Sequence, residues 1–410
     1  MIFHIDVNSA FLSWEAVYRL QNGAELDLRE IPSAVGGDQS KRRGVILAKS
    51  IPAKQFGVRT GEPIVDALRK CPSLTIVPAH HGMYEAYSSQ FLNLLREYTP
   101  DVEKYSIDEA FMDMTGMESL IGDPIAFAHK LKNRISRELG FTVNIGISSN
   151  KLLAKMASDF KKPDRVHTLF PEEIKDKMWP LPVSDLIFVG KSTEHTLKKL
   201  GIYTIGELAR TDPAILRCHL KKHGEAIWRF ANGEDSQVVE PIPEDNKGYG
   251  NSTTIAFDVT DEGTAKMVLL SLCETVGARL RRDGMKGEII SVSIKNFELN
   301  TVSHQTVLHA PTNITSELHA QACRLFDELW DGSPIRLLGV RMSRVSREES
   351  GRQLSLFDKT DYEKLEKVDQ AVDKIRKKYG QNAIMRASFL KPPIENGTDG
   401  HPNKKSNRKV

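Results

Sequence analysis

The order of periodic segments in the first third of the chain constrains the fold more than any other feature of the sequence. Strand-like alternation marks four stretches, and two amphipathic helices lie between them. The strands are residues 2–7, 101–107, 109–114 and 141–148, and the helices are residues 84–98 and 123–139. The order strand, helix, strand, strand, helix, strand, with a large insertion after the first strand, predicts a split βαβ, ferredoxin-like sheet.

Two adjacent carboxylates, Asp108 and Glu109, lie at the junction of the strand pair. Neighbouring negative charges repel each other, and burial makes either charge costlier. In the predicted sheet the first strand lies beside the pair, so Asp6 at its end faces both residues, and we expect a cation to hold the three carboxylates together. On spacing alone, a solvated hairpin turn capped by the two carboxylates explains the pattern equally well.

The carboxylates are suitable ligands for Mg²⁺, which prefers carboxylate and carbonyl oxygens and keeps waters for substrate phosphates. The backbone carbonyl of Val7 could add one more oxygen. Two such ions about 3.5–4 Å apart can clamp the attacking and leaving oxygens of a phosphoryl transfer. A cation site of this composition would suit phosphoryl-transfer chemistry with two Mg²⁺ ions, while the capped hairpin turn stays open as the alternative.

Composition limits the remaining possibilities. A chain of 410 residues is too long for one ordinary core, and two to four domains are expected. The net charge of +3 is only weakly basic, so nucleic-acid binding must depend on local patches. The four cysteines are far apart and form no CxxC pair, which favours a reduced chain. No leader or membrane-spanning apolar run is evident, so we expect a soluble, cytoplasmic protein.

The pattern changes beyond residue 165. Residues 166–232 are predicted to be all-helical and are rich in lysine, and residues 240–250 have the proline, glycine and charge of a linker. Alternating strands with helices between them return over residues 251–347 and predict a second α+β domain. One more amphipathic helix follows, whose predicted apolar face consists of Leu365, Val368, Val372 and Ile375.

Three motifs, IDVNSAF, YSIDEAF and NIGISSNKLLAKMASDFKKP, occur in this order at suitable separations. Together they resemble the Y-family translesion DNA polymerases, and specifically the bacterial DNA polymerase IV (DinB-like) branch. The resemblance extends over about residues 1–347, because GVRTGEPIVDALRKCP is similar to the fingers segment of that family and IRLLGVRMSRV to the last strand of its little finger.

The resemblance implies an α+β multidomain chain shaped as a right hand, with a ferredoxin-like palm, small fingers, a helical thumb and an α+β little finger. The domains expected on this basis are the palm at residues 1–10 and 78–165, the fingers at 11–77, the thumb at 166–232, a linker at 233–250, the little finger at 251–347 and a C-terminal extension at 348–410.

The resemblance also assigns roles in nucleotide addition. Asp6 and Asp108 would hold both metals, with Glu109 on the metal at the primer end, while a primer 3′-hydroxyl attacks the α-phosphate of a dNTP. Phe11 aligns with the steric gate that collides with a ribose 2′-hydroxyl, although an aromatic residue at a helix start is more often part of the core. Lys162 aligns with the lysine that binds the triphosphate.

The fingers depart from the family pattern at two positions. The family has Tyr and Arg in a YxxR pattern that contacts the phosphates, whereas this chain has Ile51 and Lys54. Lysine keeps the charge but loses the bidentate fork of arginine, and isoleucine loses the hydroxyl donor.

Two regions are expected to hold DNA through its backbone. FVGKSTEHTLKKLGI, residues 188–202, resembles a helix-hairpin-helix, in which backbone N–H groups at a helix N-terminus bind a phosphate. Phe188 replaces the usual first glycine of the hairpin, and an ordinary helical turn is the alternative. The predicted DNA-binding residues are Gly190, Lys191 and Lys198 in this hairpin and Arg341 and Arg344 in the little finger.

The stretch QLSLF resembles the peptide by which bacterial polymerases dock on the sliding clamp. Its predicted contact residues are Gln353, Leu354, Leu356 and Phe357. In many relatives the peptide is terminal, whereas this chain continues to residue 410. The alternative is an amphipathic fragment that packs on the chain itself.

The leading hypothesis is a low-fidelity, template-directed DNA polymerase for translesion synthesis, with a mutator role in DNA repair and replication. Its expected partners are primer–template DNA, dNTP and the sliding clamp, and it is expected to be a monomer. A UmuC-type polymerase subunit that needs a partner is one alternative. A catalytically silent accessory protein that binds the clamp or DNA is another.

Overall fold

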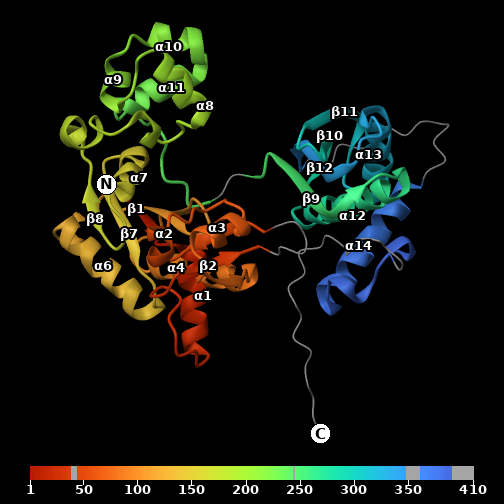
Figure 1. The fold of residues 1–410 in the computed structure, drawn as a ribbon, viewed down its shortest axis with the longest axis horizontal. Coiled ribbons are helices and arrows are strands. Elements are labelled where there is room, and N and C mark those ends of the chain that lie inside the picture. Colours follow the sequence, from red (N-terminus) through yellow and green to blue (C-terminus); the bar gives the residue numbers. More distant parts are fainter. Residues whose placement is uncertain (38–43, 243–244, 348–360, 390–410) are drawn as a thin grey trace. The chain divides into compact units, whose positions relative to one another are not determined.

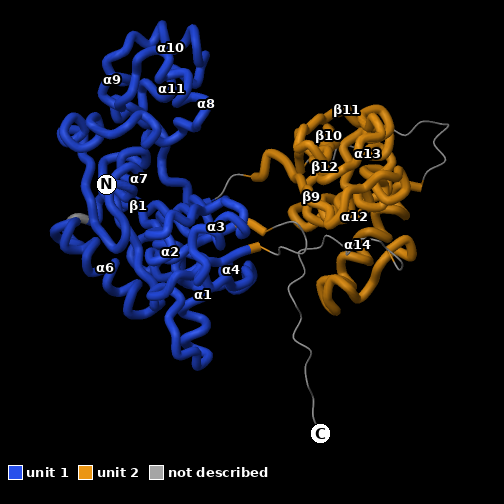
Figure 2. The backbone as a smooth tube through the Cα atoms, in the orientation of Figure 1, with its two compact units in different colours: residues 1–36, 46–243 blue, residues 37–45, 244–410 orange. Residues whose placement is uncertain are grey.

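The computed structural model divides the chain into two units, residues 1–36 with 46–243 and residues 37–45 with 244–410 (Figure 2). It describes residues 1–37, 44–242, 245–347 and 361–389. The QLSLF peptide, with Gln353, Leu354, Leu356 and Phe357, therefore lies outside the described residues.

The first unit contains a five-stranded sheet of order β5-β6-β1-β7-β8 (Figure 1). The central strand β1 is antiparallel to both β6 and β7, and β5 is antiparallel to β6. This order confirms the predicted split βαβ sheet, with the first strand beside the strand pair. The strands are β1 (Ile2–Val7), β5 (Val102–Lys104), β6 (Glu109–Asp113), β7 (Val143–Ser148) and β8 (Val166–Thr168).

The edge strand β8 corrects the prediction that residues 166–232 are all-helical. Val166 to Thr168 pair in parallel with β7. The outer side of β7 offers backbone hydrogen-bonding groups, and a short extended segment satisfies them better than an isolated helical turn would.

Helices cover both faces of this sheet. The core on one face joins Phe3 and Ile5 of β1 to Phe91 of α4 (His81–Arg96) and Leu131 of α6 (Pro124–Leu139). On the other face α7 (Lys151–Asp159) packs against β1 and β7. Side chains alternate along a strand, so His4 and Asp6 of β1 lie on the face covered by α7.

Gly146 of β7 permits the close approach of α7. A Cβ at this position would lie 1.9 Å from the Ala154 carbonyl oxygen and 2.5 Å from the Ser158 amide nitrogen. Gly146→Ala should therefore lower the free energy of unfolding by about 1–3 kcal/mol or more, since backbone atoms cannot move aside as a flexible side chain can.

Denaturant unfolding combined with hydrogen exchange in β7 checks this prediction. The matched control is Gly263→Ala, because an added Cβ there meets only Asp261 Oδ1, at 3.4 Å. Equal stability of the two variants would contradict the close approach of α7.

The segment between β1 and α4 carries a smaller sheet of order β3-β2-β4. Strand β2 pairs antiparallel with β3 and parallel with β4. The elements of this region, with the short α5 that precedes α6, are α1 (Ala10–Gln21), β2 (Ser33–Gly36), β3 (Ile46–Lys49), α2 (Ile51–Gln55), α3 (Ile64–Lys70), β4 (Thr75–Pro78) and α5 (Glu118–Ile121).

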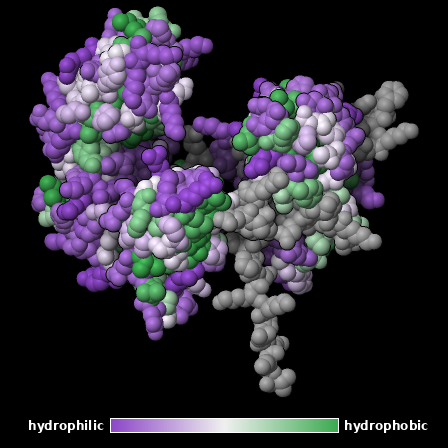
Figure 3. Space-filling view, viewed as in Figure 1, coloured by the Kyte–Doolittle hydropathy of each residue, from purple (hydrophilic) through white to green (hydrophobic). Residues whose placement is uncertain are grey.

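The end of the first unit is helical and has its own core, to which Leu197, Ile205, Leu216 and Ile227 contribute. Hydrophilic side chains cover much of its visible surface (Figure 3). Its elements are η1 (Pro171–Glu173), η2 (Ile174–Met178), η3 (Val183–Asp185), α8 (Lys191–Lys199), α9 (Ile205–Arg210), α10 (Pro213–Leu220) and α11 (Lys222–Ala231).

The second unit is an antiparallel sheet of order β11-β10-β12-β9 with helices α12 and α13 packed on one face. Strand β9 begins at Gly248, within the predicted linker, and the predicted α+β domain is otherwise present. The elements are β9 (Gly248–Val259), α12 (Glu262–Arg282), β10 (Lys286–Asn296), β11 (Thr301–Thr312), α13 (Thr315–Leu329) and β12 (Ile335–Ser346).

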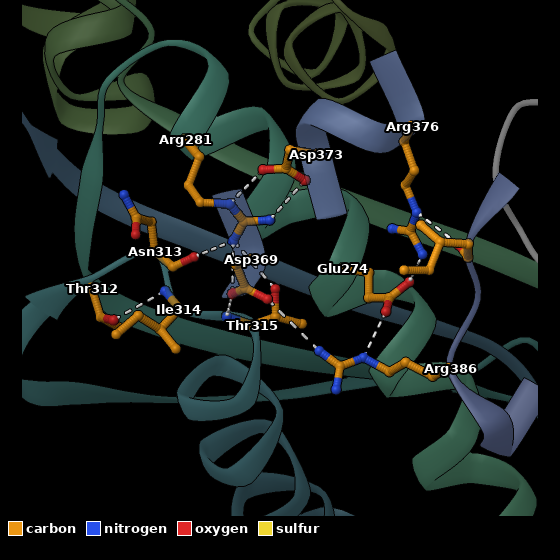
Figure 4. A network of polar contacts seen from close by, with 11 residues as sticks. Glu274, Arg281, Thr312, Asn313, Ile314, Thr315, Asp369, Asp373, Arg376 and Arg386 are labelled. Carbon is orange, nitrogen blue, oxygen red and sulfur yellow. Dashed lines mark hydrogen bonds and ion pairs between the residues drawn. The ribbon is translucent and has the colours of Figure 1, made fainter. Parts of the chain in front are cut away.

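The C-terminal helix α14 (Tyr362–Tyr379), followed by η4 (Gln381–Ala383) and η5 (Ala387–Phe389), belongs to the second unit through a polar network (Figure 4). Arg281 near the end of α12 donates to Asp369 at 3.1 Å and to Asp373 at 2.6 Å. Asp369 also accepts the Thr315 backbone N–H at 2.7 Å, at the start of α13. Arg376 donates to Glu274 of α12 at 3.0 Å.

The predicted apolar face of this helix is only partly used. Val368 is 51% exposed and Ile375 is 37% exposed, while Leu365 and Val372 are half-buried. The helix contacts α12 and α13 through charged residues. Helical periodicity therefore predicted the helix correctly but not the face by which it packs on its neighbours. Among the described residues, no helix has the length and apolarity needed to cross a membrane.

Candidate active site

The backbone brings the three predicted carboxylate residues together. Asp6, near the end of β1, is the antiparallel partner of Glu109, the first residue of β6. The Val7 N–H donates to the Asp108 carbonyl at 3.0 Å. The arrangement follows from the strand order, as the sequence predicts.

The three side chains have separate partners. Asp6 Oδ2 accepts from Lys162 Nζ at 2.7 Å, Glu109 pairs with Lys155, and Asp108 Oδ1 accepts from Ser106 Oγ at 2.6 Å. In the part of the chain that the structure describes, no group of three or more His, Cys, Asp or Glu side chains is arranged to hold a metal ion. Strands β1 and β6 are thus adjacent as predicted, while the side-chain carboxylates of Asp6, Asp108 and Glu109 each bind a different partner.

The donor chemistry of this cluster suits a hard divalent cation, because it supplies carboxylate and backbone oxygens and no sulfur. Burial raises the pKa of Asp6 to about 6, against the opposing effect of Lys162, and Glu109 and Asp159 raise it further. Burial would lower the pKa of Lys162, but Asp6 and Asp159 outweigh it and raise that pKa. A buried carboxylate next to other carboxylates requires nearby positive charge.

His4 is a buried residue of this site that sequence reasoning missed. Its Nδ1 lies 2.8 Å from Ser158 Oγ, and its Nε2 lies 3.8 Å from Glu109 Oε1. Burial, with Lys155 and Lys162, holds the pKa of His4 well below its usual value, so a neutral imidazole faces Glu109. The signal was its spacing, since His4 precedes Asp6 by two residues and lies on the same face of β1.

The lysines of α7 divide into two groups. Lys155 and Lys162, the latter just beyond the helix, pair with Glu109 and Asp6. Lys151 instead pairs with Glu103 at 2.7 Å and is nearly buried. Only the first group lies at the carboxylate cluster.

Phe11 lies in the first turn of α1, after Ser9 at a left-handed φ of 48°. Its ring stacks on Tyr84 of α4 with centroids 4.7 Å apart and an interplanar angle of 15°. It also meets His81 edge-on at 5.9 Å. Phe11 is half-buried, so one side of the ring packs against the core and the residue stays partly accessible.

Ile51 and Lys54 lie on the short helix α2. Ile51 is 51% exposed and Lys54 is exposed, and Ser50 caps the helix by accepting the Ala53 N–H. No hydrogen bond or ion pair recorded for the described residues joins either side chain to the carboxylate cluster. Burial lowers the pKa of the neighbouring Lys49, and the positive charge of Lys54 lowers it further. Sequence reasoning missed Lys49.

The predicted hairpin starts helix α8. Gly190 is its N-cap and Lys191 its first residue, and Lys198 pairs with Glu194 at 2.7 Å. Phe188 has a φ of +70°, the left-handed conformation that glycine adopts without strain, and is 57% exposed. The backbone therefore keeps the turn that glycine normally permits.

The two predicted arginines of the second unit lie differently on β12. Arg341 is exposed and lines an open groove on the sheet with small polar residues such as Asn251, Ser291 and Ser293. Arg344, at a φ of 49°, pairs with Glu288 at 3.5 Å. The left-handed φ of Arg344 departs from regular strand geometry, so the alternation of a strand does not fix which face its side chain occupies.

Comparison with known proteins identifies matching regions in both units. Residues 5–159 match the impB/mucB/samB family, and residues 246–356 match the C-terminal domain of that family. Residues 171–202 match the HHH motif of the IMS family. The matched regions contain Asp6, Asp108 and Glu109.

Relatives and a solved structure extend the match to nearly the whole chain. DNA polymerase IV of Clostridium acetobutylicum is 47% identical over 95% of this chain and 98% of its own. DNA polymerase IV of Acetivibrio thermocellus is 38% identical over 95% of this chain and 97% of its own length. A Y-family DNA polymerase chimera shares the fold, with a TM-score of 0.72 and 23% identity over 85% of this chain and 99% of that chain.

These matches confirm the predicted α+β polymerase fold and the prediction of a translesion DNA polymerase, and they do not favour a silent accessory protein or a dependent subunit. A polymerase of this kind requires a divalent metal. The chain therefore belongs to the impB/mucB/samB family, as a Y-family DNA polymerase of the DNA polymerase IV type.

Proposed function

We propose that this polymerase adds dNTPs to a primer 3′-hydroxyl on template DNA, including damaged template, with low fidelity. The observation that carries this proposal is the pairing of Asp6 with Glu109 beside the contact between Val7 and Asp108. Primer extension by the purified chain with Mg²⁺ on undamaged and lesion-containing templates is the direct test. Extension only after adding a partner protein would support the UmuC-type alternative.

At the proposed site, Asp6, Asp108, Glu109 and the Val7 carbonyl would hold two Mg²⁺ ions. Bound there, they would activate the primer hydroxyl and neutralise charge that develops on the triphosphate. Ser106 orients Asp108 through its hydrogen bond at 2.6 Å. We assign the palm to residues 1–10 and 78–165, the fingers to 11–77, the thumb to 166–232 and the little finger to 251–347.

Lys162, with Lys155 beside it, is proposed to bind the triphosphate as a point charge. Ile51 and Lys54 are proposed to contact the nucleotide from the fingers, with weaker directional bonding than the usual Tyr and Arg provide. Exposure of both side chains on α2 supports their availability to a ligand.

We propose that DNA is held through phosphates at the N-terminus of α8, where Gly190 and Lys191 lie, with Lys198 adding positive charge. In the second unit we assign backbone contacts to Arg341, which is exposed on the sheet, and Arg344. Such contacts position DNA without reading its sequence. The monomeric state and cytoplasmic location remain predictions.

Phe11→Ala should raise ribonucleotide incorporation relative to deoxyribonucleotide incorporation, because it removes the bulk proposed to collide with the 2′-hydroxyl. The aromatic contact to Tyr84 is lost as well, so the variant's folding must be verified by circular dichroism. Single-nucleotide kinetics with matched dNTP and rNTP give the ratio of kcat/KM values. An unchanged ratio in a folded variant would assign Phe11 to the core alone.

Replacing Leu356 and Phe357 together by Ala should abolish stimulation by the sliding clamp and spare clamp-free extension on short primers. Apolar anchors dominate short-peptide binding, and tethering raises the effective concentration of the enzyme at the primer end. Clamp affinity and extension with and without clamp check the prediction, with Ser355→Ala as the matched control. Equal clamp affinity of the wild type and the double variant would exclude the peptide.

A further inference from the structure

Glu15 is a buried carboxylate that the proposed mechanism does not use. It lies on α1 one turn after Phe11, and its side chain is 1% exposed. A buried carboxylate is unfavourable unless donors surround it. Glu15 has three, since Arg19 Nε lies at 3.1 Å, His80 Nδ1 at 3.0 Å and the Tyr84 hydroxyl at 3.1 Å.

Tyr84 connects this carboxylate to Phe11. Its side chain is fully buried, its hydroxyl donates to Glu15 Oε2, and its ring stacks on Phe11 at 4.7 Å. Burial, together with Glu15, raises the pKa of Tyr84 far above its usual value, so the hydroxyl remains a donor. The contacts thus run without a gap from Glu15 through Tyr84 to the ring of Phe11.

Phe11 depends on this support because it is only half-buried. Its other aromatic neighbours, Trp14 and His81, meet it at larger centroid distances of 6.0 and 5.9 Å and at steeper angles. The Tyr84 ring is therefore the nearest and the most nearly parallel of the aromatic rings that contact Phe11. Because Phe11 is the proposed steric gate, a shift of its ring would change the space left for a ribose 2′-hydroxyl.

We propose that Tyr84 and Glu15 are positioning residues that hold Phe11 in place and so set how strictly ribonucleotides are excluded. The proposal rests on the gate function assigned to Phe11 above. Tyr84 acts through its ring, and Glu15 acts by fixing the hydroxyl of that ring.

The ratio of kcat/KM values for rNTP and dNTP separates positioning from mere folding. Tyr84→Leu removes the stacking ring and should raise the ratio by about three- to tenfold, the size expected from the strength of one aromatic pair. Tyr84→Phe keeps the ring and removes the hydroxyl, and Glu15→Gln weakens the acceptor by removing its charge. Each should raise the ratio by about two- to threefold, and both together by no more than either alone.

Tyr87→Phe is the matched control. Tyr87 lies one turn further along α4, and its hydroxyl donates to Gln21 Oε1 at 3.2 Å, but its recorded ring contacts are with Trp14 and Phe141. It should leave the sugar ratio unchanged although it too loses a tyrosine hydroxyl on the same helix.

The double variants with Phe11→Ala decide how the effect is transmitted. Tyr84→Leu should add nothing to the ratio when Phe11 is already alanine, because no gate remains to be positioned. An equal increase in both backgrounds would overturn the inference. The inference would also be overturned if Phe11→Ala raised the ratio and Tyr84→Leu left it unchanged. If Tyr84→Leu fails to fold, the same conclusion would follow from an unchanged ratio in both Tyr84→Phe and Glu15→Gln. If Phe11→Ala itself has no effect, the gate assignment fails and this inference with it.

Discussion

Asp108→Asn should lower primer extension by at least about 10²–10³-fold, the loss found when one electrostatic group that stabilises a transition state is removed. Asparagine keeps the size of aspartate and an acceptor for Ser106, whose hydroxyl bonds Asp108 at 2.6 Å. It removes the negative charge that divalent cations require. Folding and DNA binding should remain, because phosphate contacts are assigned to other parts of the chain.

Steady-state extension, together with DNA binding by fluorescence anisotropy, tests this expectation. Asp113→Asn, four residues after Glu109, is the matched control, since Asp113 is half-buried at the far end of β6 and accepts the Thr115 N–H. Near wild-type extension by Asp108→Asn would remove Asp108 from the metal site. Loss of DNA binding in parallel would indicate a folding defect instead.

Asp369→Ala should lower the stability of the second unit by about 2–4 kcal/mol, because Arg281 is left with Asp373 as its carboxylate partner and the buried Thr315 N–H loses its acceptor. Arg281 is 7% exposed and Asp369 is 9% exposed, so the arginine loses a buried partner that solvent cannot easily replace. The Thr315 N–H at the start of α13 loses its acceptor at the same time. The lost ion pair weakens the docking of α14, and the lost acceptor weakens the start of α13, so the two effects should be detected separately.

Hydrogen exchange resolves them, with faster exchange expected in both α13 and α14. The control is Asp373→Ala, which removes a more exposed carboxylate, 27% accessible, and leaves Asp369 on Arg281. Its effect should be smaller. Unchanged exchange in α13 of Asp369→Ala would show that the contact to Thr315 contributes nothing to stability.

The sequence predicts the sheet well because strand and helix periodicities differ and the order of elements admits few topologies. Asp6 could be assigned to the neighbourhood of Asp108 and Glu109 for the same reason, since adjacent antiparallel strands place their ends together. His4 was missed although its spacing from Asp6 places it on the same face of β1, because a single histidine at that spacing does not by itself indicate a functional residue.

Side-chain partners are less accessible to sequence reasoning. Lys155 and Lys151 lie four residues apart on one helix, yet they pair with Glu109 and Glu103 on different strands. The docking of α14 was also beyond prediction, because its contacts depend on Arg281 and Glu274, distant in sequence, while its apolar residues Val368 and Ile375 are exposed. These details depend on tertiary distances that no local period records.

The anchoring of α14 has a consequence for deletion experiments. A fragment cut where the family match ends, at residue 356, would retain Arg281 and discard Asp369 and Asp373, both of its carboxylate partners. Such a fragment would leave Arg281 and the Thr315 N–H at the start of α13 without the acceptors that α14 supplies. A deficit in its activity would therefore not distinguish lost stability of the second unit from a lost binding partner. Point substitutions that leave the helix in place are therefore the sounder way to ask what the C-terminal region does.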